Sequence, residues 1–340
     1  MALSVRFLSK IAFLCATAVF SVAANEADSK LLISSIQNKD MKGIEIALKR
    51  GADVNYELKS DTYARTPLGT AFIGFFNKKD QVELSKTHKI IELLLRKKAV
   101  VPTNQNELFT VYCYGSKKTV SLLLLNGLNP HLKLYGYTTA EFAVKYENTE
   151  LLPLLYSRNV PKVDPETRVQ LELIAGAHRY DIQKMETAIK AGAKVNKYDP
   201  GGETALCVNL DIPLADFACK NVISLVIGHD ANPNMPTKTQ DGNGNYPLHL
   251  AISKSYGLPK IENIMLIVGM LIERGADVNA RNEFMETPLH SAAKHNLVPV
   301  VRALLAKGAD PKARDFRGRE PSVLTTSLEI KNLIYAASKP

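Results

Sequence analysis

Residues 275–279 read Gly-Ala-Asp-Val-Asn, and residues 308–312 read Gly-Ala-Asp-Pro-Lys. The two segments begin 33 residues apart, and residues 51–55 carry an earlier copy, again Gly-Ala-Asp-Val-Asn. Self-similarity at a period near 33 residues is the signature of repeated helix–loop–helix units that stack side by side. The chain is therefore predicted to be an all-α solenoid, an architecture that more often provides surfaces for binding than pockets for chemistry.

A second motif precedes the last two copies. Residues 287–293 read Thr-Pro-Leu-His-Ser-Ala-Ala and begin 21 residues before Gly308, and residues 246–251 read Tyr-Pro-Leu-His-Leu-Ala. Thr at a helix start can cap unbonded backbone amides, and Pro is tolerated in the first turn because its missing N–H was unbonded anyway. Gly can end a helix in the left-handed conformation, which costs other residues more. The combined pattern resembles that of ankyrin repeats.

The resemblance implies about eight helix–loop–helix repeats with short β-hairpin tips and a C-terminal cap. In ankyrin repeats the His of the second motif bridges neighbouring repeats through hydrogen bonds. The resemblance therefore implies that His249 and His290 have this structural role. No Cys or acidic residues accompany the two at the spacing of a metal site.

The 21-residue offset locates weaker copies of the repeat. It leads back from Gly127 to Asn106 and from Gly192 to Leu171, and Asn159 takes the place of the glycine in another copy. Gly228 is the expected glycine of the copy that begins at Thr204. Two longer units carry insertions, at 73–87 around Phe75-Phe76-Asn77-Lys78-Lys79-Asp80 and at 255–261 around Tyr256; each is either a binding loop or a tolerated surface insertion. We predict one domain over 25–340, with repeats ending near 55, 101, 131, 163, 196, 234, 280 and 312, and the cap over 313–340.

The first 24 residues have the pattern of a secretory signal peptide: Arg6 and Lys10, then an apolar run from Ile11 to Phe20, then small residues up to Ala24. We expect cleavage after Ala24. A lipoprotein attached through Cys15 and an uncleaved membrane anchor are the alternatives, although Leu14 is not the small residue that lipid attachment requires. No glycosylation sequon occurs, so the pattern favours bacterial Sec-type export to the periplasm or beyond. In that compartment Cys207 and Cys219 could form a disulfide, and Cys113 is expected to be a buried thiol.

The sequence holds no complete motif of a known catalytic or metal site. Residues 241–252 begin like a calcium loop, but Tyr246 and Ile252 stand where Gly and Glu are needed. No GxxxxGK, GxSxG or HExxH motif occurs, and the histidines and cysteines form no nucleophile–base pattern. We therefore predict a non-enzymatic protein with no catalytic residues, no cofactor and no metal.

The charge balance favours an acidic protein partner. The chain carries a net charge of +9, of which Arg6 and Lys10 contribute two, so +7 remains after cleavage. The basic residues are dispersed, so nucleic acid is not expected as a partner. The sequence predicts a monomer with no membrane segment after cleavage.

The resemblance also assigns binding positions, because ankyrin repeats hold partners on their concave side with hairpin tips and with polar residues after the two alanines. Phe284 and Met285 are the most suggestive pair, since a tip has no core to bury them. The positions assigned are Lys145, Tyr146, His178, Arg179, Ser253, Lys254, Phe284, Met285, Glu286, Lys294, His295, Phe316, Arg317 and Arg319.

The predicted function is therefore that of a protein–protein interaction scaffold outside the cytoplasm. Two alternatives stay open at this point. One is a periplasmic accessory factor that protects or assembles a specific enzyme, for instance in oxidative defence. The other is an exported effector directed at a host.

Overall fold

The computed structural model describes residues 25–58, 66–76, 81–210, 217–238, 243–253 and 261–339, except the side chains of residues 76, 81, 209 and 217–219. Several predictions lie outside the described residues: the signal peptide over 1–24, residues 77–80 of the first insertion, residues 255–260 of the second insertion, the binding position Lys254, and residues 241–242 of the loop compared with a calcium site. The Cys207–Cys219 disulfide lies outside them too, because it depends on the side chain of Cys219.

The chain forms two compact units, and unit 1 comprises Met1–Leu134 and Thr138–Pro161. Residues 25–37 are helical, and the structure then places its elements in this order: α2 (Met41–Lys49), α3 (Pro67–Phe72), η1 (Ile73–Phe76), α4 (Gln81–Arg96), α5 (Gln105–Tyr114), α6 (Lys117–Leu125), β1 (Lys133–Leu134), β2 (Tyr137–Thr138), α7 (Thr139–Lys145), η2 (Thr149–Leu151) and α8 (Leu152–Tyr156). The two short strands pair with each other and are the only strands among the described residues.

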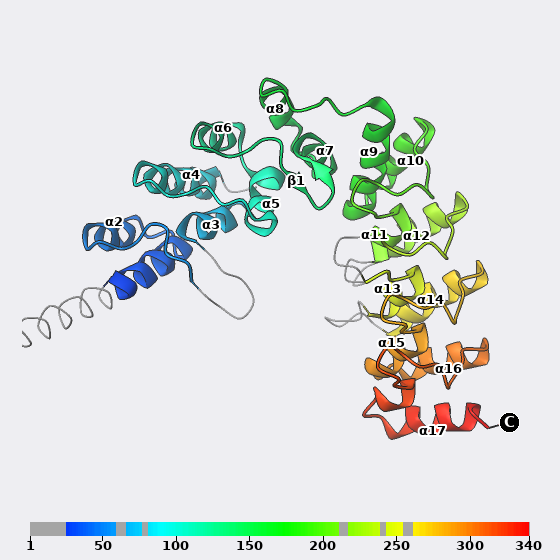
Figure 1. The fold of residues 1–340 in the computed structure, drawn as a ribbon. Helices are drawn as coiled ribbons and strands as arrows, with labels where there is room; N and C mark the ends of the chain where they lie inside the picture. Colours follow the sequence, from blue (N-terminus) through cyan, green and yellow to red (C-terminus); the bar gives the residue numbers. More distant parts are fainter. Residues whose placement is uncertain are drawn as a thin grey trace, which may run out of the picture. The chain divides into compact units, whose positions relative to one another are not determined.

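Unit 2 comprises Tyr135–Tyr137 and Lys162–Pro340. Its elements are α9 (Pro165–Arg179), α10 (Ile182–Lys190), α11 (Ala205–Leu210), α12 (Phe217–Gly228), α13 (Pro247–Ser253), α14 (Ile261–Glu273), α15 (Pro288–Lys294), α16 (Val298–Ala306), η3 (Pro321–Val323) and α17 (Leu328–Ala337). Within this unit the first helices contact each other in succession, α9 with α11, α11 with α13 and α13 with α15. Figure 1 shows the resulting stack of helix pairs from α9 to α17. The predicted all-α solenoid is confirmed.

In several repeats the first helix begins where the sequence places a Thr. Thr66 accepts a hydrogen bond from Gly69 N at 3.0 Å, and Pro67 follows as the first helical residue of α3. Thr138 and Glu141 cap α7 reciprocally, each side chain accepting from the other's backbone N–H. These bonds satisfy amides that the helix itself cannot bond.

The second helix of a repeat ends in the left-handed conformation, but not always at the residue predicted. Gly308 has φ +85° and Asn159 has φ +60°, as expected. Gly228 is a correction: it is the last residue of α12, and Asp230 takes the left-handed position with φ +59°. Asp tolerates this conformation better than most residues because its short side chain can bond locally.

One helix start is also corrected. Asn104, not Asn106, caps α5 by accepting from Glu107 N at 2.8 Å.

Neighbouring repeats of unit 2 are joined by the asparagine that ends the Gly-Ala-Asp-Val-Asn segment at 275–279 and by the asparagines that end its weaker copies at 192–196 and 230–234. Asn279 donates to Gly308 O at 3.0 Å and accepts from Asp310 N at 2.8 Å. Asn196 and Asn234 make the same pair of bonds to the next repeat. Because each bond joins adjacent repeats only, cohesion is local, as in other solenoids.

Candidate functional site

Among the described residues of unit 2, three loops share one construction, and we call each of them a finger: residues 199–203, 282–286 and 315–319. Each begins with an Asp or Asn whose side-chain oxygen accepts from the backbone N–H two and four residues later. Asn282 Oδ1 accepts from Phe284 N at 3.0 Å and Glu286 N at 2.9 Å, and Asp315 Oδ1 accepts from Arg317 N and Arg319 N, both at 2.9 Å. Asp199 binds its own loop in the same way. These bonds fix the shape of each finger without a regular strand.

One residue of the second finger has an unfavourable backbone conformation. Met285 has φ +57°, whereas the matching positions of the other two fingers are Gly202 and Gly318. A left-handed residue other than Gly costs roughly 1–2 kcal/mol. Its side chain is exposed, so no burial offsets that cost.

We therefore expect Met285→Gly to raise the free energy of unfolding by about 0.5–1 kcal/mol, since the greater freedom of Gly in the unfolded chain offsets part of the gain. Urea unfolding of the whole chain measures it. Gly318→Met in the next finger is the matched control and should destabilise. A loss of stability in Met285→Gly would show that the Met side chain stabilises the finger.

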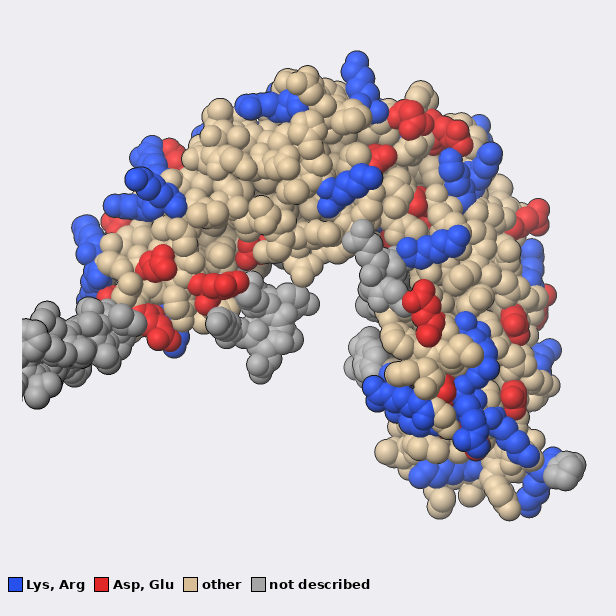
Figure 2. All heavy atoms as spheres, in the orientation of Figure 1, with Lys and Arg blue, Asp and Glu red and all other residues tan. Residues whose placement is uncertain are grey.

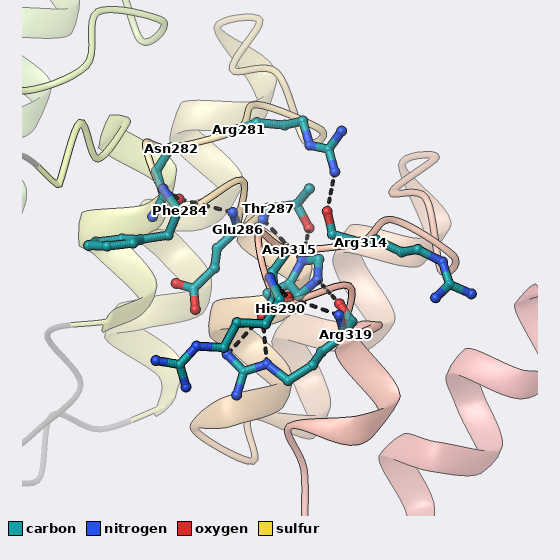
Figure 3. Close-up of polar contacts among 10 residues, drawn as sticks. Arg281, Asn282, Phe284, Glu286, Thr287, His290, Arg314, Asp315 and Arg319 are labelled. Atoms are coloured by element: carbon teal, nitrogen blue, oxygen red, sulfur yellow. Dashed lines mark hydrogen bonds and ion pairs between the residues drawn. The ribbon is translucent and has the colours of Figure 1, made fainter.

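The second and third fingers are joined to each other. Phe316 N donates to Phe284 O at 2.9 Å, and the two rings lie with their centroids 5.8 Å apart. The Arg281 guanidinium donates to the backbone oxygen of Arg314 (Figure 3). The two fingers therefore present their aromatic side chains as one surface.

Buried His290 links the base of both fingers. Its Nδ1 accepts from Thr287 N at 3.1 Å, so its Nε2 carries the hydrogen and donates to Arg319 O at 3.1 Å (Figure 3). His249 bonds Glu286 O through Nε2 at 2.9 Å in the same way, one repeat earlier. The structural role predicted for these two histidines is confirmed.

A groove of about 480 Å³ lies beside the second and third fingers and the ends of α13 and α15. It brings together eight of the predicted binding residues: Ser253, Phe284, Glu286, Lys294, His295, Phe316, Arg317 and Arg319. The other described residues that line it are Asn243, Asn245, Asn282, Ser291 and Leu324. Figure 2 shows Lys and Arg side chains gathered on this C-terminal part of unit 2.

The charges of the groove are only partly neutralised. Arg319 bonds the Asp315 carboxylate at 2.8 Å, and Arg314, outside the groove, bonds Glu320 at 2.7 Å. Burial alone would raise the pKa of Asp315, but hydrogen bonds from Arg319 and Arg317 outweigh it and lower that pKa. The Arg317 guanidinium lies over the Phe316 ring, 5.1 Å from its centroid. Neither Arg317 nor Lys294 forms an ion pair within the described residues.

Four predicted binding residues lie elsewhere, and one of them is a correction. Lys145 is only 2% exposed and therefore cannot contact a partner as placed. Tyr146 is half-buried and packs its ring against Phe109 and Phe142. His178 is half-buried and Arg179 exposed at the end of α9, and neither lines the groove.

Met285 and Phe75 do not line the groove either, although Met285 lies at a finger tip. Phe75, suggested as part of a binding loop, is 1% exposed and packs against Phe72, so it is unavailable on the surface.

His249 makes the stability of unit 2 depend on pH. Burial lowers its pKa to about 4, whereas a histidine in the unfolded chain titrates near 6.5. Above pH 6.5 both states are neutral, and as the pH falls from 6.5 to 4 only the unfolded state gains the proton. We expect the native state to lose up to roughly 3 kcal/mol over this interval. Burial also lowers the pKa of His290, which adds to the effect in the same direction.

Urea unfolding at pH 7 and pH 4.5 measures this dependence. His249→Gln serves as the comparison, because Gln cannot take up the proton and should flatten the pH slope. An equal slope in both proteins would exclude His249 as its source.

The described residues contain no group of three or more His, Cys, Asp and Glu side chains placed to hold a metal ion. None of the helices that the structure describes is long and apolar enough to cross a membrane. Cys113 and Cys207 are both buried, as expected for Cys113.

Comparison with known protein families and proteins supports the repeat assignment. A family model for many copies of the ankyrin repeat matches residues 271–321, and a model for a single ankyrin repeat matches residues 243–283. Both matched segments lie in unit 2, and together they include the second and third fingers.

Three curated proteins are similar to part of the chain. NF-kappa-B inhibitor alpha of Sus scrofa is 37% identical over 91 residues, which are 27% of this chain and 27% of that protein. The Homo sapiens protein of the same name is 40% identical over 83 residues, which are 24% of each chain. B-cell lymphoma 3 protein of Homo sapiens is 31% identical over 113 residues, 33% of this chain and 23% of that protein. The matched segment thus spans only about a quarter of each relative's length.

Proposed function

Because residues 243–321 match models of the ankyrin repeat, we propose that the chain is an ankyrin-repeat protein and a non-enzymatic scaffold that binds a protein partner in the groove beside its second and third fingers. The observation that carries this proposal is the pair of joined aromatic tips. Phe284 is 40% and Phe316 55% exposed, although both are large apolar side chains. Exposed aromatic residues flanked by Arg are common at the energetic centre of protein interfaces.

The rigidity of the groove supports the same proposal. The backbone of both fingers is fixed by Asn282 and Asp315, and His290 ties one finger to the next. A surface whose shape is already fixed loses little conformational entropy on binding. The strained backbone of Met285 is in keeping with a loop whose sequence is not set by stability alone.

Site-specific photo-crosslinking tests the proposal directly. A photoreactive phenylalanine analogue replaces Phe284 or Phe316 in the whole chain, in cells of the source organism. We expect a protein adduct at both positions and none when the analogue replaces Lys307, which is exposed but does not line the groove. Equal adducts at all three positions, or an adduct at Lys307 alone, would exclude the groove as the binding site.

We also propose that the scaffold acts outside the cytoplasm, in the periplasm or beyond it. The basic, apolar and small-residue segments of 1–24 support this proposal. Cell fractionation followed by intact-mass measurement is expected to find a product that begins at Asn25. A product that keeps Met1, in the membrane or in the cytoplasm, would contradict it.

A further inference from the structure

Building on the proposed binding function, we propose that the groove receives an extended acidic segment of the partner. In this arrangement a bulky apolar side chain of the segment packs on Phe284 and Phe316, and a neighbouring carboxylate binds Arg317 and Lys294. The ligand is thereby specified as an acidic segment with a bulky apolar side chain, whereas the binding function alone does not specify its chemistry.

The volume of the groove favours a short extended segment. About 480 Å³ accommodates a few side chains rather than the face of a folded domain. Its lining combines the apolar side chains of Phe284, Phe316 and Leu324 with the polar side chains of Asn243 and Ser291. Such a lining suits a peptide that offers both a side chain and its backbone polar groups.

The cations beside the aromatic pair determine which charge the ligand must carry. Arg319 has a carboxylate partner already, in Asp315. Arg317 and Lys294 have none within the described part of the chain, and both are exposed. The contact with the Phe316 ring orients the Arg317 guanidinium, whose planar fork matches a carboxylate. A carboxylate next to an apolar side chain would therefore contact both features at once.

The Glu286 carboxylate lines the groove and repels an acidic ligand, so it limits where the acidic groups of the ligand can lie. Glu286 has no ion pair within the described residues. Among the described lining residues, two uncompensated cations, Arg317 and Lys294, stand against this one anion, so the balance still favours an acidic segment over a basic one. A carboxylate of the ligand is repelled near Glu286 and attracted near Arg317, which gives the segment a preferred position.

Fluorescence anisotropy with synthetic peptides tests the inference on the whole mature chain. The probe is a labelled peptide of sequence Glu-Asp-Leu-Asp-Phe-Glu-Asp, compared with an amide version (Gln and Asn for Glu and Asp), a version with Ala for Leu and Phe, and a basic version with Lys for the acids. We expect the acidic peptide to bind most tightly and its affinity to fall as salt is added. Removing either the charges or the apolar side chains should weaken binding.

Matched variants locate the contacts. Arg317→Gln is expected to weaken binding of the acidic peptide about five- to tenfold, after allowance for the exposure of the pair. Lys294→Gln should weaken it less, and Glu286→Gln should tighten it. Lys307→Gln removes the same charge outside the groove, in the repeat that holds Lys294, and should change the affinity by less than about twofold. Circular dichroism confirms that each variant is folded.

The opposite outcomes overturn the inference. They are failure of the acidic peptide to bind, equal or tighter binding of the basic peptide, or equal effects of Arg317→Gln and Lys307→Gln. The photo-crosslinking at Phe284 separates this failure from that of the proposed function. An adduct at Phe284 together with a failed peptide experiment would reject the acidic segment and keep the scaffold, whereas loss of both would reject the two together.

Discussion

Phe142→Ala is expected to destabilise unit 1 by about 3–5 kcal/mol, the range seen when a fully buried aromatic residue is truncated. Phe142 is 0% exposed on α7 and contacts two further rings. Its centroid lies 5.6 Å from that of Phe109, in an edge-to-face arrangement, and 4.6 Å from that of Tyr146. Such ring pairs contribute beyond the area they bury.

Urea unfolding monitored by hydrogen exchange over α5 and α7 measures this loss. Phe142→Leu is the conservative control, because it keeps most of the buried volume and should cost clearly less. A change below about 1 kcal/mol for Phe142→Ala would mean that the ring cluster does not hold α5 and α7 together.

Leu304→Ala is expected to cost about 2–5 kcal/mol and to act on the C-terminal end of unit 2 first. Leu304 is 0% exposed on α16, and α16 contacts α14, α15 and α17. Because the stability of a solenoid is close to a sum of neighbour terms, the loss should lower protection in α15, α16 and α17 while α9 and α10 stay protected.

Hydrogen exchange followed by mass spectrometry tests this order of unfolding. Lys307→Ala is the control, because Lys307 is exposed and forms no ion pair within the described residues, and it should change stability by less than about 0.5 kcal/mol. Uniform loss of protection from α9 to α17 in Leu304→Ala would contradict nearest-neighbour stability within unit 2.

The parts of the fold that rest on local chemistry could be predicted from the sequence. The Thr caps and the left-handed Gly308 each follow from one residue and its immediate backbone. The bridging histidines bond across repeats, and their role followed from the resemblance to ankyrin repeats. The left-handed residue after α12 is Asp230 and not Gly228, so this prediction is wrong. Asp can also adopt the left-handed conformation, and a pattern based on glycine does not detect it.

Burial of individual side chains was less predictable. Lys145 occupies a binding position of the resembled family but is buried here, because exposure depends on the helices packed around it rather than on the repeat pattern. Eight other binding positions do line one groove, since repeats in register bring matching positions of neighbouring units together.

The residues that shape the fingers were not recognised, although the sequence holds a signal for them. Asp199 and Asn282 each stand five residues before the Thr that opens the next helix, and Asp315 stands five residues before Glu320, just ahead of η3. A single Asp or Asn in a loop is too common to stand out. Three occurrences at one spacing identify the bonds that close each finger.

The most direct test of the binding site is hydrogen exchange of the whole chain with and without the partner captured at Phe284. We expect the backbone amides of 281–286, of 315–319 and around Lys294 to become more protected from exchange. We expect no change in α14 and α16, the second helices of the two repeats. The double variant Lys294→Glu and Arg317→Glu should lose both the partner and the added protection while remaining folded. Protection confined to α14 and α16, or undiminished partner binding by the double variant, would contradict the assignment of the groove.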